Sequence, residues 1–256
     1  MRRGRRQLAL GGSTALVTGA SSGIGAAIAA ELADAGTQLW LVGRDHARLN
    51  EVAAATGGQP IRVDLARPDG PAAVVHALGE RARDVGVLVH CAGRGWAGPV
   101  AQMDAATLSE VLAVDLVAPV ELTRLLLPGL LVRGGALVFL SSIAGVVGVA
   151  DEAVYSAAKA GLRAFADSLR LELGADGPSV SVVFPGAVAT PFFDRRGRPY
   201  DRSRPRQVSP QTVAATTVSA IRTGRAEVFV PGWLDIAARV RGAAPATYRR
   251  LAGRWG

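Results

Sequence analysis

The sequence predicts an α/β fold in which one doubly wound sheet of about seven parallel strands is covered by helices on both faces. Short runs of aliphatic residues alternate with longer segments of helical periodicity along the 256-residue chain. Such alternation indicates right-handed βαβ units, which place their strands parallel in one sheet. In addition, the first strand leads directly into a glycine-rich turn that opens a helix. The sequence has no internal repeat and no long linker, so we expect one domain.

The spacing of the hydrophobic residues predicts the type and position of each element. Strands are expected at residues 14–18, 39–42, 61–63, 87–90, 136–140, 180–184 and 227–230. Helices are expected at residues 24–35, 46–55, 72–83, 106–131, 153–173 and 211–222. Asp45 is interpreted as the N-cap of the second helix, and Pro119 as a kink in the long helix, because proline has no N–H to donate. The domain therefore spans residues 13–231, between a basic leader at 1–12 and a basic amphipathic extension at 232–256.

Composition excludes several classes of protein. The chain is 49% hydrophobic and 20% charged, as in an ordinary globular protein, and its net charge is +8. Its arginines are scattered and no aromatic-interleaved basic stripe or nucleic-acid motif is present, so we expect no nucleic-acid partner. One cysteine, Cys91, cannot form an internal disulfide, and the three histidines have no metal-ligand spacing. We therefore expect no metal site.

The N-terminus is interpreted as a leader on a cytoplasmic protein. Its basic residues and short apolar run imitate a signal peptide, but Gly11 and Gly12 break the run and the following segment is needed as a strand. No run in the sequence approaches the roughly 18 apolar residues typical of a membrane-spanning helix.

The glycine-rich turn "TGASSGIG", residues 18–25, predicts a site for a dinucleotide. Gly19 permits the sharp turn, Gly23 lets backbone amides approach a pyrophosphate, and Gly25 allows close packing of helix and sheet. The N-terminus of the following helix adds unpaired N–H groups and a positive dipole end. The expected site also includes Thr18, Ser21, Ser22 and Ile24.

The end of the second strand bears on the choice of cofactor. An acid there would accept a hydrogen bond from the ribose 2′-OH of NAD, whereas a guanidinium would bind the 2′-phosphate of NADP. The sequence places Arg44 and then Asp45 at this point. Because Asp45 is also a good helix cap, we favour NADP, with NAD as the alternative.

"YSAAK", residues 155–159, contains the only lysine among the 29 lysine and arginine residues. In a helix, Tyr155 and Lys159 lie side by side, since they are four residues apart. A free phenol has a pKa near 10, and a neighbouring ammonium is expected to lower it. The pair therefore predicts proton transfer at Tyr155.

The glycine turn, the Tyr155–Lys159 pair and "PGAVAT" at residues 185–190 together resemble the short-chain dehydrogenase/reductase family over about residues 13–231. The resemblance implies a Rossmann-like sheet, hydride transfer between NAD(P) and a secondary alcohol or ketone, and a Ser–Tyr–Lys centre. It implies that Ser142 holds the substrate oxygen, with its neighbour Ser141 as the alternative, and that Tyr155 is the general acid or base.

The resemblance also implies further cofactor contacts. The backbone of Val188 and the hydroxyl of Thr190, after Pro185 and Gly186, are expected to fix the carboxamide. Asp64, with Leu65 beside it, resembles the family's adenine-contacting aspartate, although Asp64 is equally explained as a strand-end cap.

Two positions depart from the family pattern. The usual Asn-Asn-Ala-Gly after the fourth strand reads "HCAG", so Ala92 and Gly93 keep the close approach while Cys91 cannot make an amide's hydrogen bonds. Asp115 replaces the asparagine of the catalytic tetrad. We expect its negative charge near Lys159 to raise the pKa of Tyr155.

Residues 191–210 are expected to form a substrate lid. Phe192 and Phe193 would cover an apolar substrate, whereas Arg195, Arg196 and Arg198 would attract an anionic one or simply be solvated. In the extension, apolar residues share two helical faces: Trp233, Ile236, Ala237 and Val240 on one, and Tyr248, Leu251 and Trp255 on the other. Such a tail would lie peripherally on a membrane, pack on a partner subunit or cover the pocket.

The favoured function is thus an NADP-preferring oxidoreductase, active on an apolar small-molecule alcohol or ketone and assembled as a homodimer or homotetramer. A nucleotide-binding sensor or scaffold without turnover is the first alternative, and Asp115 favours it. A membrane-surface protein that acts through its basic tail is the second.

Overall fold

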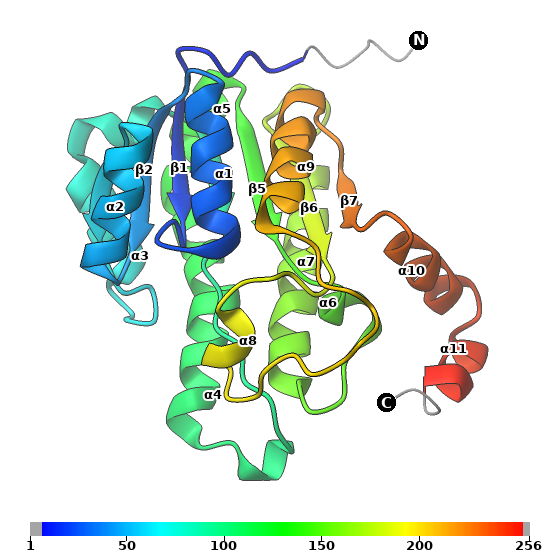
Figure 1. Ribbon diagram of the computed structural model, residues 1–256. Coiled ribbons are helices and arrows are strands. Elements are labelled where there is room, and N and C mark those ends of the chain that lie inside the picture. Colours follow the sequence, from blue (N-terminus) through cyan, green and yellow to red (C-terminus); the bar gives the residue numbers. More distant parts are fainter. Residues whose placement is uncertain (1–6, 253–256) are drawn as a thin grey trace.

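The computed structural model, which describes residues 7–252, contains one sheet of seven strands in the order β3-β2-β1-β4-β5-β6-β7, all parallel (Figure 1). The strands are β1 (Thr14–Thr18), β2 (Gln38–Gly43), β3 (Gln59–Arg62), β4 (Val85–His90), β5 (Ala136–Leu140), β6 (Ser179–Pro185) and β7 (Glu227–Val230). The predicted fold class is confirmed. Because the order reverses between β1 and β4, a crevice is expected at the carboxyl ends of these two strands.

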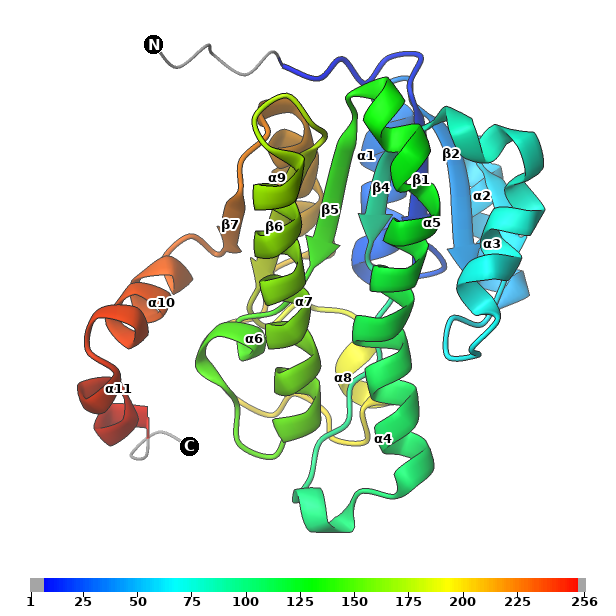
Figure 2. The same cartoon turned by 180° about the vertical axis from the view of Figure 1, so that it is seen from behind.

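Helices cover both faces of the sheet. The main helices are α1 (Gly23–Asp34), α2 (His46–Thr56), α3 (Gly70–Leu78), α4 (Ala105–Leu112), α5 (Ala118–Arg133), α7 (Ala153–Leu173) and α9 (Pro210–Thr223). Figure 1 shows α1, α2 and α9 in front of the sheet, and Figure 2, which is the view from behind, shows α3, α5 and α7 covering the opposite face. Each layer buries its apolar stripe against the strands, which is the main source of stability for such helices.

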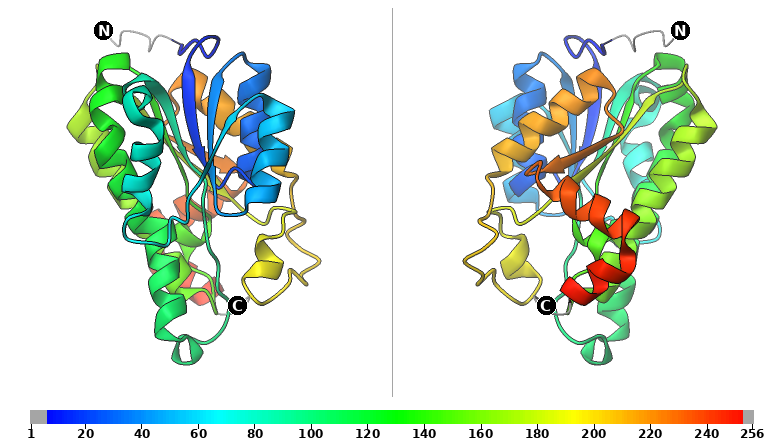
Figure 3. Two further views of the ribbon diagram at one scale, coloured as in Figure 1. Left: turned by 90° about the vertical axis from the view of Figure 1, so that its left-hand side faces the viewer. Right: turned by 90° about the vertical axis from the view of Figure 1, so that its right-hand side faces the viewer.

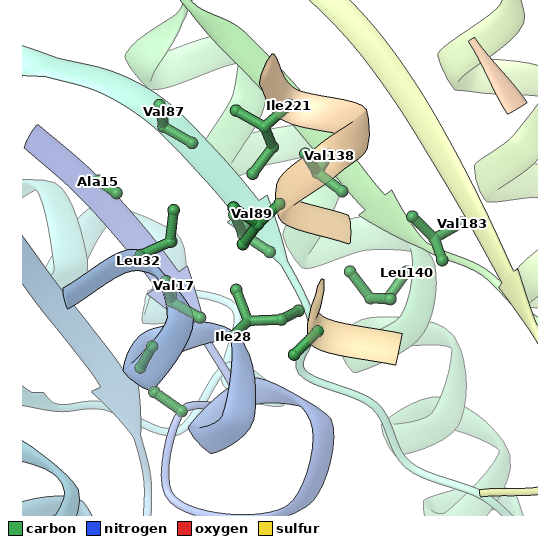
Figure 4. Packing of buried hydrophobic residues seen from close by; sticks show 14 of the residues in the cluster. Ala15, Val17, Ile28, Leu32, Val87, Val89, Val138, Leu140, Val183 and Ile221 are labelled. Carbon is green, nitrogen blue, oxygen red and sulfur yellow. The ribbon is translucent and has the colours of Figure 1, made fainter. Parts of the chain in front are cut away.

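Two apolar clusters, one on each face, hold these layers together. Successive side chains of a strand point to opposite faces, so Val17 packs toward α1 and α9 while Leu16 packs toward the other layer. In Figure 4, Ile28 and Leu32 of α1 and Ile221 of α9 meet the valines of the central strands. The buried strands therefore need apolar residues at consecutive positions, as their sequences show.

The long helix expected at residues 106–131 is divided into three parts. Between α4 and α5 lies a π-helical segment, η3 (Ala113–Val117), and Pro119 falls in the first turn of α5 instead of kinking a continuous helix. Pro119 has no N–H to donate to the turn before it, and the widened turn ends at Val117, two residues earlier. Asp115 is at its centre.

The third expected helix, at residues 72–83, is likewise shorter. It ends at Leu78 in α3 and continues as a 3-10 turn, η1 (Gly79–Asp84). Gly79, at φ +56°, ends α3 because this backbone conformation is unfavourable for other residues. A further 3-10 turn, η2 (Val100–Gln102), precedes α4.

The remaining helices lie near the carboxyl ends of the strands (Figure 3). They comprise α6 (Ala144–Val147), the lid turn α8 (Phe192–Arg195), and α10 (Leu234–Ala243) and α11 (Pro245–Ala252) in the tail. Leu234 is buried, whereas Trp233, Ile236 and Val240 are exposed. The Tyr248 hydroxyl donates to the Val147 carbonyl at 3.3 Å, so α11 lies beside α6.

Trp255, expected on the second apolar face, lies outside the described residues. Within the leader, Leu10 is buried in the core, and the Leu8 N–H donates to the Arg222 carbonyl at 3.0 Å. No helix among the described residues has both the length and the apolar content needed to cross a membrane.

Candidate active site

A cavity of about 670 Å³ opens at the carboxyl ends of the central strands, where the topology predicts a crevice. It is lined by 21 of the site residues expected from sequence: Gly19, Ser21, Ser22, Gly23, Ile24, Gly25, Arg44, Asp64, Leu65, Cys91, Ala92, Gly93, Ser142, Tyr155, Lys159, Pro185, Gly186, Val188, Thr190, Phe192 and Phe193. Thr18 and Asp115 lie behind its wall. Among the described residues no three histidine, cysteine or acidic side chains gather as a metal site would require.

The glycine turn brings backbone into close contact at two points. Gly19 has φ +67°, and a Cβ on it would lie 2.7 Å from the Ala92 Cα. A Cβ on Gly25 would lie 2.3 Å from the Gly19 carbonyl oxygen. Both contacts are with backbone, so a side chain at either position would force the turn apart. Because neither glycine has a side chain, the backbone amides of the turn are accessible from the cavity.

Gly25→Ala is expected to lower the free energy of unfolding by about 1–3 kcal/mol, because overpacking displaces the turn. It should also weaken nucleotide binding, since α1 would no longer start at the cavity wall. Gly232→Ala is the matched control, because no heavy atom lies within 4 Å of the added Cβ and its φ is not in the left-handed region. Urea unfolding and nucleotide titration of both variants measure the two effects. Equal behaviour of the two variants would contradict this account of the turn.

Thr18 joins the ends of β1 and β4 and does not line the cavity. Its hydroxyl accepts from the Cys91 and Ala92 N–H groups at 3.0 and 3.1 Å. The side chain is 1% exposed. Thr18 therefore positions the backbone at Cys91 and Ala92.

The two unusual residues of "HCAG" are both uncharged at neutral pH. Burial lowers the pKa of His90 to about 3 and raises the pKa of the Cys91 thiol to about 12. The His90 ring stacks on Phe139 at 5.0 Å between centroids, and its Nε2 lies 2.9 Å from the Thr123 hydroxyl. We therefore assign packing roles to both side chains.

Ser142, Tyr155 and Lys159 meet on one wall of the cavity. Ser142 follows β5, and its hydroxyl accepts from the Ala144 N–H at 3.1 Å. The Ser141 hydroxyl instead donates to the Lys159 carbonyl at 3.0 Å, so it is used in attaching β5 to α7. Of the two serines, Ser142 is therefore the one whose hydroxyl is near the phenol, and its influence lowers the pKa of Tyr155, against the larger effect of burial.

Lys159 forms a buried ion pair with Asp115, whereas the sequence predicted only that the two residues lie near each other. Its ammonium lies 2.9 Å from Asp115 Oδ1 and donates to the Leu140 carbonyl at 2.9 Å. The exposed fractions of the two side chains are 5% for Lys159 and 0% for Asp115. Asp115 Oδ2 also accepts from the Arg94 N–H at 2.9 Å. Burial raises the pKa of Asp115, and the Lys159 ammonium opposes this by favouring the carboxylate.

The ionisation of Tyr155 differs from the expectation that Lys159 makes the phenol acidic. Burial raises the pKa of Tyr155 above its ordinary value of 10, and the charges of Asp115 and Glu152 add to the rise. The Lys159 ammonium is 5.7 Å from the centroid of the phenol ring. Because Asp115 neutralises this ammonium, little of its charge acts on the phenol. The charge of Asp115 raises the pKa of Tyr155, in the direction predicted from the sequence.

At the opposite end of the cavity, the two candidate residues after β2 have different environments. Asp45 caps α2: its Oδ1 accepts from the Arg48 N–H at 3.1 Å and its Oδ2 from Arg48 Nε at 2.8 Å. Arg44 lines the cavity and is exposed. Asp64 also lines the cavity, but its Oδ1 accepts from the Ala66 N–H at 3.0 Å. The helix-cap interpretation of Asp45 is therefore confirmed.

The segment after β6 packs between the glycine turn and the lid. A Cβ on Gly23 would lie 3.0 Å from Thr190 Cγ2, so Thr190 faces the glycine turn. The Val188 carbonyl accepts from Gln207 Nε2 at 3.3 Å, and Val188 forms a bridge with Val208. These contacts hold both ends of the lid against the cavity.

The lid contacts the residues that immediately precede α7, the helix that carries Tyr155 and Lys159, and sequence reasoning missed these contacts. Arg196 forms an ion pair with Glu152, whose side chain is 13% exposed, and Arg198 pairs with Asp151 at 2.6 Å. Phe192 packs against Tyr155, with 5.5 Å between the ring centroids. Of the three lid arginines considered in the sequence, Arg196 and Arg198 are therefore occupied by acids of this chain, and Arg195 is not. A cluster of arginines was evident in the sequence, but nothing in it identified their partners.

Comparisons with known proteins agree with this geometry. Residues 13–201 match the family model described as short chain dehydrogenase. The chain is 37% identical over 233 residues to the ketoacyl reductase HetN of Nostoc sp., which covers 86% of this chain and 79% of HetN. It is 35% identical over 194 residues to the uncharacterized oxidoreductase YmfI of Bacillus subtilis, covering 71% of this chain and 77% of that protein. A short-chain dehydrogenase from Sphingobium yanoikuyae, solved in complex with NADPH, is 30% identical with a TM-score of 0.81, covering 94% of this chain and 95% of that one.

Proposed function

Since the chain belongs to the short-chain dehydrogenase/reductase family of oxidoreductases, we propose that it transfers a hydride between NADP(H) and an apolar ketone or the corresponding secondary alcohol. The observation that carries this proposal is the meeting of Ser142, Tyr155 and Lys159 on one wall of a cavity whose other wall is the glycine turn. Phe192 lies beside the phenol and adds an apolar surface for the substrate.

The residues around the glycine turn fit a dinucleotide. A Cβ at Gly19 or Gly25 would collide with backbone, so both positions must be glycine, and the backbone can then approach the ligand closely. We assign the pyrophosphate to the amides of this turn, the adenosine to Asp64 and Leu65, and the carboxamide to Val188 and Thr190. When bound, the reduced nicotinamide supplies a hydride to the carbonyl carbon, while a proton goes to the oxygen.

The preference for NADP rests on the charges after β2. Asp45 is occupied by Arg48 and by capping α2, so it is poorly placed to accept from a ribose hydroxyl. Arg44 is exposed at the cavity and has a guanidinium suited to a phosphate. The structure of a 30% identical relative with NADPH is compatible with this choice.

The proton chemistry favours ketone reduction at neutral pH. Because burial and nearby acids raise the pKa of Tyr155, the phenol stays protonated and can donate to a carbonyl oxygen. We assign Ser142 to holding that oxygen through its hydroxyl, and Lys159 to binding the cofactor ribose. Alcohol oxidation requires the phenolate, so we expect its rate to rise with pH in the alkaline range.

Asp115→Asn is expected to shift alcohol oxidation to lower pH. The substitution removes a negative charge that raises the pKa of Tyr155 and releases the Lys159 ammonium, so both changes favour the phenolate. The pH dependence of kcat/KM for oxidation measures the shift. Asp151→Asn makes the same charge change nearby without contacting Lys159, and should leave the profile unchanged. A wild-type profile in Asp115→Asn would refute this role of the carboxylate.

The function is tested by following NADPH and NADH oxidation with a panel of apolar ketones, in wild type and Arg44→Ala. We expect turnover with NADPH, and a fall of about tenfold in kcat/KM for NADPH but not NADH in the variant, as for a lost charge-assisted hydrogen bond. Binding of NADPH without reduction of any ketone would favour a sensor or scaffold. Failure to bind either nucleotide would exclude both functions.

We also propose that the protein is a homo-oligomer. Leu131 and Val132 of α5 and Leu171 of α7 are exposed apolar side chains, which a second subunit would cover. Its cytoplasmic location and a peripheral membrane contact through residues 232–256 remain predictions from the sequence.

A further inference from the structure

Three arginines gather around one carboxylate at the adenosine end of the cavity. Arg44 follows β2, Arg48 belongs to α2, and Arg195 ends the lid turn α8. The carboxylate, Asp45, makes its hydrogen bonds and its ion pair with Arg48. Within residues 7–252, neither Arg44 nor Arg195 has a carboxylate within ion-pair distance. This corner of the cavity therefore carries two unneutralised guanidinium groups.

Arg195 reaches this corner from a distant part of the chain. Its Nη1 donates to the Ser22 hydroxyl at 3.3 Å, across 173 residues of sequence. Ser22 precedes α1, and its side chain makes no capping hydrogen bond to that helix. Arg195 is thus bound to the glycine turn itself, while its neighbours Arg196 and Arg198 are paired with the acids that precede α7.

The arrangement is electrostatically unfavourable unless an anion joins it. Burial lowers the pKa of Arg195, and the charges of Arg48 and Arg44 lower it further, with Asp45 opposing them. Like charges that are held together and partly desolvated favour an anionic ligand between them. The amides at the N-terminus of α1 add to this preference.

We propose that Arg195, carried by the lid, and Arg44, at the end of β2, together hold the 2′-phosphate of NADPH, and that this phosphate keeps the lid closed. The inference rests on the proposed preference for NADP and adds a second recognition residue to it. A phosphomonoester has three terminal oxygens, so it can accept from two guanidinium groups at once. NADH lacks this group and would leave the two arginines repelling each other. Cofactor choice would thereby be coupled to closure of the substrate site.

The proposal is tested by titrating NADPH and NADH into full-length wild type, Arg195→Ala and Arg206→Ala. Arg206 is the matched control, because it is an exposed lid arginine outside the cavity. We expect Arg195→Ala to raise the Kd of NADPH by about 10- to 100-fold, as for lost hydrogen bonds to a charged group, and the Kd of NADH by about twofold or less. Arg206→Ala should change neither constant.

A second readout follows the lid directly. The lid contains chymotrypsin sites at Phe192, Phe193 and Tyr200, so its cleavage rate reports closure. We expect adenosine 2′,5′-bisphosphate, but not adenosine 5′-monophosphate, to slow cleavage in wild type, and expect neither to do so in Arg195→Ala.

The outcomes separate this proposal from the one on which it rests. If Arg195→Ala leaves both Kd values unchanged, or weakens the binding of NADPH and of NADH equally, Arg195 does not bind the 2′-phosphate. Wild type that binds NADPH and NADH equally would instead overturn the NADP preference itself, and this inference with it.

Discussion

Tyr155→Phe is expected to lower kcat for ketone reduction by about 10²- to 10⁴-fold, the usual contribution of a positioned general acid. The variant keeps the aromatic ring, which packs against Phe192, and removes only the hydroxyl beside Ser142. We therefore expect the Kd of NADPH and the free energy of unfolding to stay close to those of wild type. Steady-state kinetics and nucleotide titration measure the two properties separately.

Tyr248→Phe provides the matched control for this experiment. Its hydroxyl donates to the Val147 carbonyl at 3.3 Å, and neither residue lines the cavity, so it takes part in packing of the tail. Turnover in this variant should match wild type within about twofold, as for a surface substitution. If Tyr155→Phe retained wild-type turnover, the protein would have to draw its proton from another group and the proposed mechanism would fail.

Local sequence patterns predicted the parts of the site that depend on neighbouring residues. β5, α7 and β7 have the predicted bounds, because each is a strongly periodic or continuous apolar segment between clear breaks. The pairing of Tyr155 with Lys159 follows from helical geometry alone, and the glycine turn follows from steric limits. These features need no knowledge of distant residues.

The remaining features depend on contacts between segments far apart in sequence. Arg196 lies 44 residues from its partner Glu152, and Asp115 lies 44 residues from Lys159. Sequence placed a negative charge near Lys159 but could not show that the two groups form a buried pair. It consequently did not show that burial and nearby acids, and not the ammonium of Lys159, dominate the pKa of Tyr155. The π-helical turn at Asp115 was also missed, since Pro119 was interpreted as a kink.

Lys159→Met is expected to lower the free energy of unfolding by about 3–5 kcal/mol at neutral pH, because it leaves a buried carboxylate without its counter-charge. Asp115 is fully buried, so the carboxylate cannot recover the lost interaction from water. The double variant Lys159→Met/Asp115→Asn removes both charges, and the amide oxygen can still accept from the Arg94 N–H. We expect it to regain most of the lost stability.

The loss in Lys159→Met should grow with pH. Burial raises the pKa of Asp115 above its ordinary value of 3.8, and removing the ammonium takes away the main opposing influence. A folded-state pKa above the unfolded value means that folding binds a proton, so stability is present below about pH 4 and decreases as pH rises through the folded pKa. Urea unfolding of the variant at acidic and neutral pH measures this dependence.

Arg163→Met is the control for the ion pair, because Arg163 pairs with Glu227 at 2.8 Å with both side chains 33% exposed. Solvent screens such a pair, so its loss should cost about 1 kcal/mol or less. An equal loss in Lys159→Met would mean that the buried pair contributes nothing special to the fold. If the loss in Lys159→Met is larger, a fall in the activity of this variant has two causes, the lower stability of the fold and the missing ammonium. The double variant regains stability but not the ammonium. Its remaining loss of activity therefore measures the contribution of the ammonium to catalysis.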